Sequence, residues 1–102
     1  MRGCYLVGFV RVDVDDHQLK AAIEALLFIS GSPITVDRLK GIFEDASKEE
    51  IETQLRAIKT AYEERNAGIM LTEVAGGWQM ATCAEHAPWV RKFKAVKVST
   101  RL

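Results

Sequence analysis

The clearest apolar pattern along the chain has helical spacing. Its stripe consists of Leu19, Ala22, Ile23, Leu26 and Leu27. Asp15 or Asp16 can cap this helix, and Gly31 with the proline that follows can end it. Phe28 and Ile29 widen the stripe to nearly the whole circumference near the end of the helix, which predicts that this helix is central in the fold.

Two further helices are predicted. After a short extended link at residues 33–35, Thr35 can cap the second, whose apolar face consists of Leu39, Ile42 and Phe43. Ser47 and Glu50 form a capping box that starts the third, which runs to about Arg65. The stripe of this third helix is Ile51, Leu55, Ile58 and Tyr62.

A β-hairpin follows the third helix, which Asn66-Ala67-Gly68 ends. The predicted strands are Ile69–Val74 and Trp78–Thr82, joined through Ala75-Gly76-Gly77. Ile69 and Leu71 share one strand face, as do Trp78 and Met80. Three helices followed by a two-stranded wing predict an α+β, mainly α, winged-helix domain, a variant of the helix-turn-helix.

Both ends of the chain differ from this domain. The alternation of Val10, Val12 and Val14 with polar residues predicts an extended N-terminal arm over residues 1–14. The segment from Ala84 predicts a helical turn that packs back on the core. The winged helix therefore spans residues 15–93, and residues 94–102 form a basic linker.

Composition supports one globular domain. The 102 residues are 48% hydrophobic, and 14 basic residues balance 14 acidic ones. The balance is uneven along the chain, because residues 89–102 contain five basic residues and no acidic one. The folded part is consequently acidic.

The acidic residues bear directly on DNA binding, because the third helix is the one that a helix-turn-helix places in the major groove. Its N-terminal part carries Glu49, Glu50 and Glu52, and the wing from Glu73 to Gln79 contains no Arg or Lys. Repulsion of phosphates by these carboxylates disfavours major-groove reading. Acids in a first turn also have a purely structural explanation, since they complement the helix dipole.

Catalytic and metal chemistry has little support in this sequence. Cys4, Cys83, His17 and His86 lie in no metal-ligand spacing, and no nucleophile–base–acid set or phosphate-binding loop stands out. Two unpaired cysteines and the absence of a signal-peptide cleavage pattern predict a cytoplasmic protein. The lack of a catalytic or metal-binding arrangement makes an enzyme the weakest interpretation.

Aromatic residues that we expect to be exposed are the best candidates for binding a partner protein. They are Tyr5, Phe9, Trp78, Trp89 and Phe93. An alternative for Trp89 and Phe93 is that they fold back to cover the open end of the core, because tryptophan is usually well buried.

Three runs of sequence together resemble the segregation and condensation protein B (ScpB) family. They are LKAAIEALLFISGSPI at residues 19–34, IMLTEVAGGWQMAT at residues 69–82 and HAPWVRKF at residues 86–93. The resemblance covers residues 17–102, and the helix end EALLF with the hairpin EVAGGW is fairly specific in combination.

The resemblance implies a non-enzymatic adaptor without a cofactor. ScpB proteins have two winged-helix domains, form homodimers and bind the kleisin ScpA, which bridges the heads of the SMC ATPase in a condensin-like complex for chromosome condensation and segregation. Self-association is associated with the first domain. Residues 98–102 resemble the linker to a second domain, so we expect this chain to be a fragment or a truncated product, and residues 1–14 match no family feature.

The sequence therefore supports two functional hypotheses. The leading hypothesis is a dimerising, nucleoid-associated adaptor of a kleisin–SMC complex, in which the N-terminal arm could pair with its symmetry mate by strand addition. The alternative is the DNA-binding domain of a transcription regulator, whose best support is the basic set Arg91, Lys92, Lys94, Lys97 and Arg101.

Overall fold

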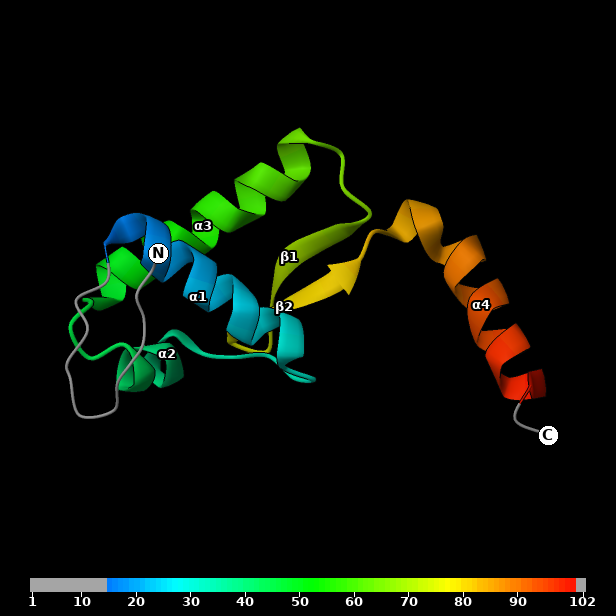
Figure 1. Ribbon diagram of the computed structural model, residues 1–102, viewed down its shortest axis with the longest axis horizontal. Coiled ribbons are helices and arrows are strands. Elements are labelled where there is room, and N and C mark those ends of the chain that lie inside the picture. The colour runs from blue at the N-terminus through cyan, green and yellow to red at the C-terminus, as the bar shows by residue number, and fades with distance from the viewer. Residues whose placement is uncertain (1–14, 101–102) are drawn as a thin grey trace.

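A computed structural model describes the backbone of residues 15–100 and the side chains of residues 15–95 (Figure 1). The elements are α1 (Asp16–Ile29), α2 (Val36–Ile42), α3 (Lys48–Glu64), β1 (Ile69–Val74), β2 (Gly77–Thr82), a short 3-10 turn (Ala84–His86) and α4 (Ala87–Thr100). The predicted N-terminal arm, with Tyr5 and Phe9, lies outside the described residues.

The first three helices begin at the predicted caps. The side chains of Asp15, Thr35 and Ser47 each accept a hydrogen bond from the backbone N–H three residues further on, at 2.8, 3.1 and 3.0 Å. Glu50 completes the capping box by accepting from the backbone N–H of Ser47 at 2.9 Å. At the end of α3, Asn66 adopts a φ of 54°, a conformation that asparagine tolerates better than most residues. The predicted starts of the three helices and the predicted end of α3 are confirmed.

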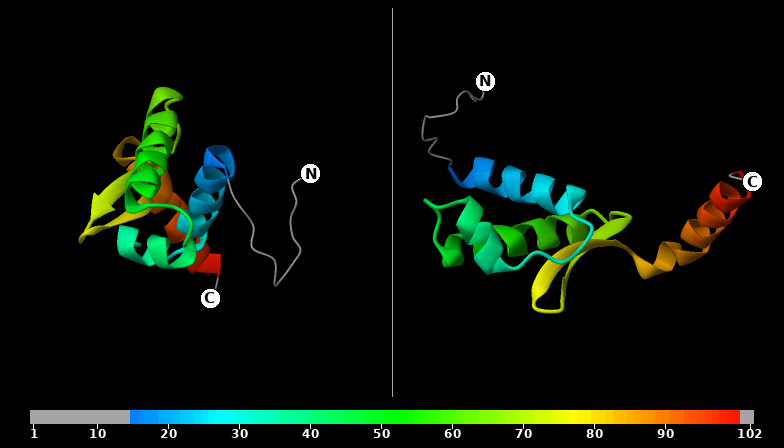
Figure 2. Two further views of the ribbon diagram at one scale, coloured as in Figure 1. Left: turned by 90° about the vertical axis from the view of Figure 1, so that its left-hand side faces the viewer. Right: turned by 90° about the horizontal axis from the view of Figure 1, so that it is seen from below.

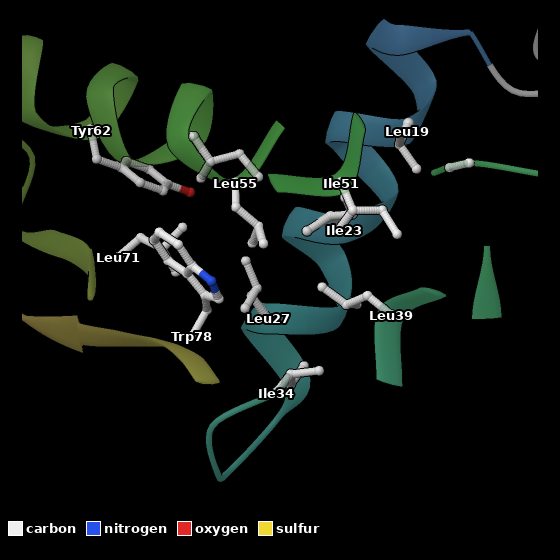
Figure 3. Close-up of a cluster of buried hydrophobic side chains, with 12 residues drawn as sticks. Leu19, Ile23, Leu27, Ile34, Leu39, Ile51, Leu55, Tyr62, Leu71 and Trp78 are labelled. Atoms are coloured by element: carbon white, nitrogen blue, oxygen red, sulfur yellow. The ribbon is translucent and has the colours of Figure 1, made fainter. Parts of the chain in front are cut away.

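The core lies between α1, α2, α3 and the hairpin (Figure 3). Its most buried large side chains are Ile23, Leu27, Leu39, Ile51, Leu55, Ile58 and Leu71. The predicted α3 stripe is buried along its whole length, and Gln54 joins it as a buried polar side chain. The amphipathic pattern of α3 thus correctly predicted the face that packs on α1 and β1.

The hairpin matches the predicted wing. Ala75 and Gly76 have φ values of 52° and 79°, the geometry of a type I′ turn, and Val74 pairs with Gly77 across it. The extended link also forms, because Ile34 makes an isolated antiparallel bridge to Trp78 with hydrogen bonds of 2.8 and 2.9 Å. This order of helices, link and hairpin is a winged helix, as predicted.

The C-terminal segment differs from the prediction of a single turn that packs back. It is helical from Ala87 to Thr100 and points away from the three-helix core beyond the hairpin (Figures 1 and 2). Pro88 is compatible with the first turn of a helix, and no glycine or proline follows it to interrupt the helix. The prediction that this segment packs back on the core is therefore wrong.

Candidate protein-binding surface

Two of the predicted aromatic residues lie together on α4. Trp89 and Phe93 are four residues apart, so they occupy adjacent turns of one helix face, and each is 66% exposed. The alternative that they cover the open end of the core is wrong for this structure. The Nζ atom of Lys92 lies 5.8 Å from the centroid of the Trp89 ring. We call Trp89 and Phe93 the α4 ridge.

Trp78 belongs to the core instead of the surface. It is 3% exposed, and its backbone bridge to Ile34 holds the start of β2 against the link (Figure 3). The antiparallel register puts Trp78 on the same sheet face as Leu71, which is fully buried. The expectation that Trp78 is exposed is therefore wrong, because register and link together turn it inward.

The last turn of α1 carries exposed apolar residues that the sequence prediction missed. Phe28 is 77% exposed and Ile29 is 75% exposed, so the widened stripe did not mean burial on all sides. In this turn Leu27 is buried in the core, and Leu26 packs against the core while partly buried. The sequence did contain a signal for this surface, because two large apolar residues next to an already complete apolar stripe also indicate a binding surface.

A groove runs beside α1. It has a volume of about 290 Å³ and is lined by Ala21, Glu24, Ala25, Phe28, Tyr62 and Met80. The two alanines are four residues apart on one face of α1, and their small side chains leave space between this helix, α3 and β2. We call this cavity the α1 groove. It is mainly apolar, with one carboxylate.

Tyr62 and Glu24 join α3 to α1 at this groove. The hydroxyl of Tyr62 donates a hydrogen bond to Oε2 of Glu24, and the guanidinium of Arg65 lies 4.9 Å from the Tyr62 ring centroid. Burial raises the pKa of Tyr62 above its ordinary value of 10.0, and the hydrogen bond to Glu24 and the charge of Glu24 raise it further. Arg65 opposes these effects. The phenol is therefore held in its neutral, donating form.

This raised pKa predicts a pH-dependent contribution to stability. A group with a higher pKa in the folded state stabilises the fold fully below its unfolded pKa, near 10, and loses that contribution as the pH rises through the folded pKa. Tyr62→Phe should lower the free energy of unfolding by about 1 kcal/mol at pH 8. The gap between wild type and variant should narrow above about pH 10. Urea denaturation followed by circular dichroism measures both, and a gap that stays constant would contradict the assignment.

The surface of α3 carries the predicted acidic residues. Glu49, Glu50 and Glu52 are exposed at its N-terminal end, where Glu50 also completes the cap. At the wing, Glu73 is exposed and the turn consists of Ala75 and Gly76. A phosphate backbone approaching this end of α3 would meet carboxylates, which opposes major-groove docking.

Cys83 and His86 take part in local contacts. The Sγ atom of Cys83 donates to the backbone oxygen of Ala67 at 3.3 Å, and Nε2 of His86 lies 3.4 Å from Oε2 of Glu85. Within the described residues, no group of three or more His, Cys, Asp or Glu side chains is placed to hold a metal ion. The same part of the chain has no helix long and apolar enough to span a membrane.

Comparison with known proteins identifies the family. Residues 21–102 match the family model described as segregation and condensation complex subunit ScpB. The chain belongs to the ScpB family. It is 37% identical over 89 residues to segregation and condensation protein B of Syntrophotalea carbinolica, which is 87% of this chain and 44% of that protein. It is 36% identical over 76 residues to that of Desulforamulus reducens, which is 74% of this chain and 41% of that protein. The chain thus spans less than half the length of these relatives.

Solved structures agree with this membership and with the winged-helix fold. The crystal structure of ScpB from Mycobacterium tuberculosis matches with a TM-score of 0.80 and 30% identity, covering 85% of this chain and 54% of that one. A crystal structure of a dimer of the ScpB N-terminal domain complexed with an ScpA peptide matches with a TM-score of 0.67 and 31% identity. That match covers 72% of this chain and 91% of that one. The resemblance seen in the sequence is confirmed.

Proposed function

We propose that this chain acts as a dimerising, non-enzymatic adaptor in a bacterial ScpA/ScpB–SMC complex for chromosome condensation and segregation. The observation that carries the proposal is the match to the dimer of an ScpB N-terminal domain with an ScpA peptide, which covers 91% of that domain. The adaptor would work in the cytoplasm, associated with the nucleoid, and would need no cofactor. Its partners would be a second copy and the kleisin ScpA, and through ScpA the SMC ATPase.

The surface chemistry supports a protein partner over DNA. The exposed apolar residues Phe28, Ile29, Trp89 and Phe93 are large side chains of the kind that anchor protein interfaces. The acidic N-terminal end of α3 opposes the docking that a helix-turn-helix uses on a duplex. A protein adaptor needs exposed apolar residues to bind its partner, and an acidic end of α3 does not hinder that role.

Co-purification with ScpA tests the proposal. The 102-residue chain, alone and joined to the second winged-helix domain of an ScpB relative, is expressed with ScpA and analysed by size exclusion with light scattering. We expect a dimer that captures ScpA in at least the joined form, and no retention of mixed-sequence duplex at low salt, where counterion release favours binding most. The proposal would be refuted by a chain that is strictly monomeric and captures ScpA neither alone nor in the joined form.

A further inference from the structure

The α1 groove runs along the helix that residues 1–14 directly precede. Three of its lining residues, Ala21, Ala25 and Phe28, are spaced by four and three positions, so they form one line along α1. All three are exposed. At 1.5 Å per residue, this line begins about 8 Å along the axis from the first residue of α1 and ends about 18 Å from it. The groove is therefore within a few turns of the point where the preceding segment joins the helix.

The groove suits an uncharged, apolar occupant. Its one lining carboxylate, Glu24, already accepts a hydrogen bond from the Tyr62 hydroxyl, and within the described residues no buried side-chain nitrogen or oxygen lacks a hydrogen-bond partner. An inserted segment would therefore need to supply no donor or acceptor. Met80 offers a flexible thioether that packs favourably on aromatic rings. α4 does not fill the groove of its own chain, because it points away from the core beyond the hairpin (Figures 1 and 2).

Residues 4–10 have the chemistry of such an occupant. Their sequence is CYLVGFV, seven residues without a charge, and its aromatic side chains are Tyr5 and Phe9. Apolar side chains gain free energy when they leave water for an apolar surface. The match to the ScpB family model begins at residue 21, so this segment lies outside what the family resemblance explains.

The segment is also long enough to reach the groove. Phe9 precedes Asp15 by six residues and Tyr5 precedes it by ten, which allows spans of up to about 20 Å and 33 Å. A chain that turns back at Asp15 can bring Phe9 beside Ala21, which lies about 9 Å along α1. It can likewise bring Tyr5 beside Phe28, about 20 Å along the helix. Along an extended chain the two aromatic residues are about 13 Å apart, close to the length of the groove line.

We propose that residues 5–9 turn back and dock in the α1 groove of their own chain, with Phe9 beside Ala21 and Tyr5 beside Phe28. The tether makes the contact intramolecular, and a short linker provides a millimolar effective concentration. The contact would cover Phe28, whose side chain is 77% exposed in the described structure. It goes beyond the adaptor role, because this self-contact must open before another protein can use the groove.

A single cysteine in the groove reports whether the groove is covered. The background is the 102-residue chain with Cys4→Ser and Cys83→Ser, in which the serine hydroxyl can replace the Sγ donor to Ala67. Ala25→Cys then places the sole thiol in the groove, and Thr53→Cys is the matched control at an exposed position of α3. The rate of alkylation by N-ethylmaleimide measures how often each thiol is accessible.

The groove thiol should react at least about tenfold more slowly with the intact arm than with the arm variant Tyr5→Ser and Phe9→Ser, because it reacts only while the groove is open. The Thr53→Cys control should react at rates within about twofold in the two arms. Val12→Ser with Val14→Ser removes apolar residues from the connecting part of the arm and should change the groove rate less than about threefold. Circular dichroism verifies that each variant is folded.

Mixing distinguishes a contact within one chain from a contact between copies. The Ala25→Cys chain with the altered arm is mixed with an excess of cysteine-free chain that keeps the intact arm, and the copies are given time to exchange. The thiol should stay reactive, because each arm serves its own groove. Protection in the mixture would show docking between copies and would overturn the contact within one chain.

Other outcomes also overturn the proposal. Equal alkylation rates of the groove thiol with the intact and the altered arm would show that the arm does not cover the groove. Ala21→Cys, which is also exposed in the groove, repeats the measurement if Ala25→Cys does not fold. A groove thiol that is protected only after ScpA is added would assign the groove to the kleisin. All of these results leave the proposed function standing, because co-purification with ScpA tests it separately.

Discussion

Trp78→Ala should lower the free energy of unfolding by about 3–5 kcal/mol, the range for loss of a buried large aromatic side chain. Trp78 is 3% exposed and packs in the cluster that includes Leu71 and Leu27. Its removal leaves a cavity between the hairpin and α1, because the bridge from β2 to Ile34 limits how far the backbone can move to fill it.

Trp89→Ala is the matched control for Trp78→Ala, because it removes the same side chain from an exposed position. Its effect on the unfolding free energy of the monomer should stay within about 0.5 kcal/mol. Denaturant titration followed by far-ultraviolet circular dichroism is suitable, since this signal does not depend on tryptophan fluorescence. Equal costs for the two substitutions, measured at concentrations where the chain is monomeric, would contradict the assignment of Trp78 to the core and Trp89 to the surface.

Gly77→Ala should destabilise the fold by about 1–3 kcal/mol, the usual cost of inserting a methyl group into a packed site. A Cβ atom at Gly77 would lie 2.9 Å from the backbone oxygen of Ile34 and 3.1 Å from its nitrogen. Ile34 also makes both bridge hydrogen bonds to Trp78, so any shift that relieves the clash weakens the bridge. Backbone atoms cannot rotate away as a flexible side chain could.

Gly41→Ala is the matched control with the opposite sign. Gly41 lies in α2, and a Cβ atom there meets nothing within 4 Å. Alanine in a helix should therefore stabilise the protein by up to about 1 kcal/mol. The two substitutions add the same methyl group, so thermal unfolding of both separates close packing from helix propensity. A Gly77→Ala variant as stable as wild type would contradict the close approach of Gly77 to Ile34.

Local sequence signals predicted most of the elements. Caps such as Asp15, Thr35 and Ser47 satisfy exposed backbone donors within one turn, so their effect depends only on residues three positions apart. The turn at Gly76 is local in the same way. The α3 stripe was also readable, because helical periodicity alone decides which residues share a face.

Contacts between segments far apart in the chain could not be predicted from local sequence signals. Trp78 and Trp89 have the same side chain and lie close in sequence, yet one is buried and the other exposed. Phe28 and Ile29 continue an apolar stripe, yet they face outward because the core side of α1 is already occupied by Leu27. The continuation of α4 past Phe93 was likewise missed, since its basic composition also fits a linker.

The sequence by itself determined the order of helices and wing, the helix starts and the family, because these depend on local propensity and on motifs of adjacent residues. Only the tertiary structure decided which aromatic residues are buried, that Gly77 must be glycine, and that α1, α3 and β2 form a groove. Each of these depends on how far-apart segments pack, and the free energy of packing depends on volumes and backbone distances that no local pattern encodes.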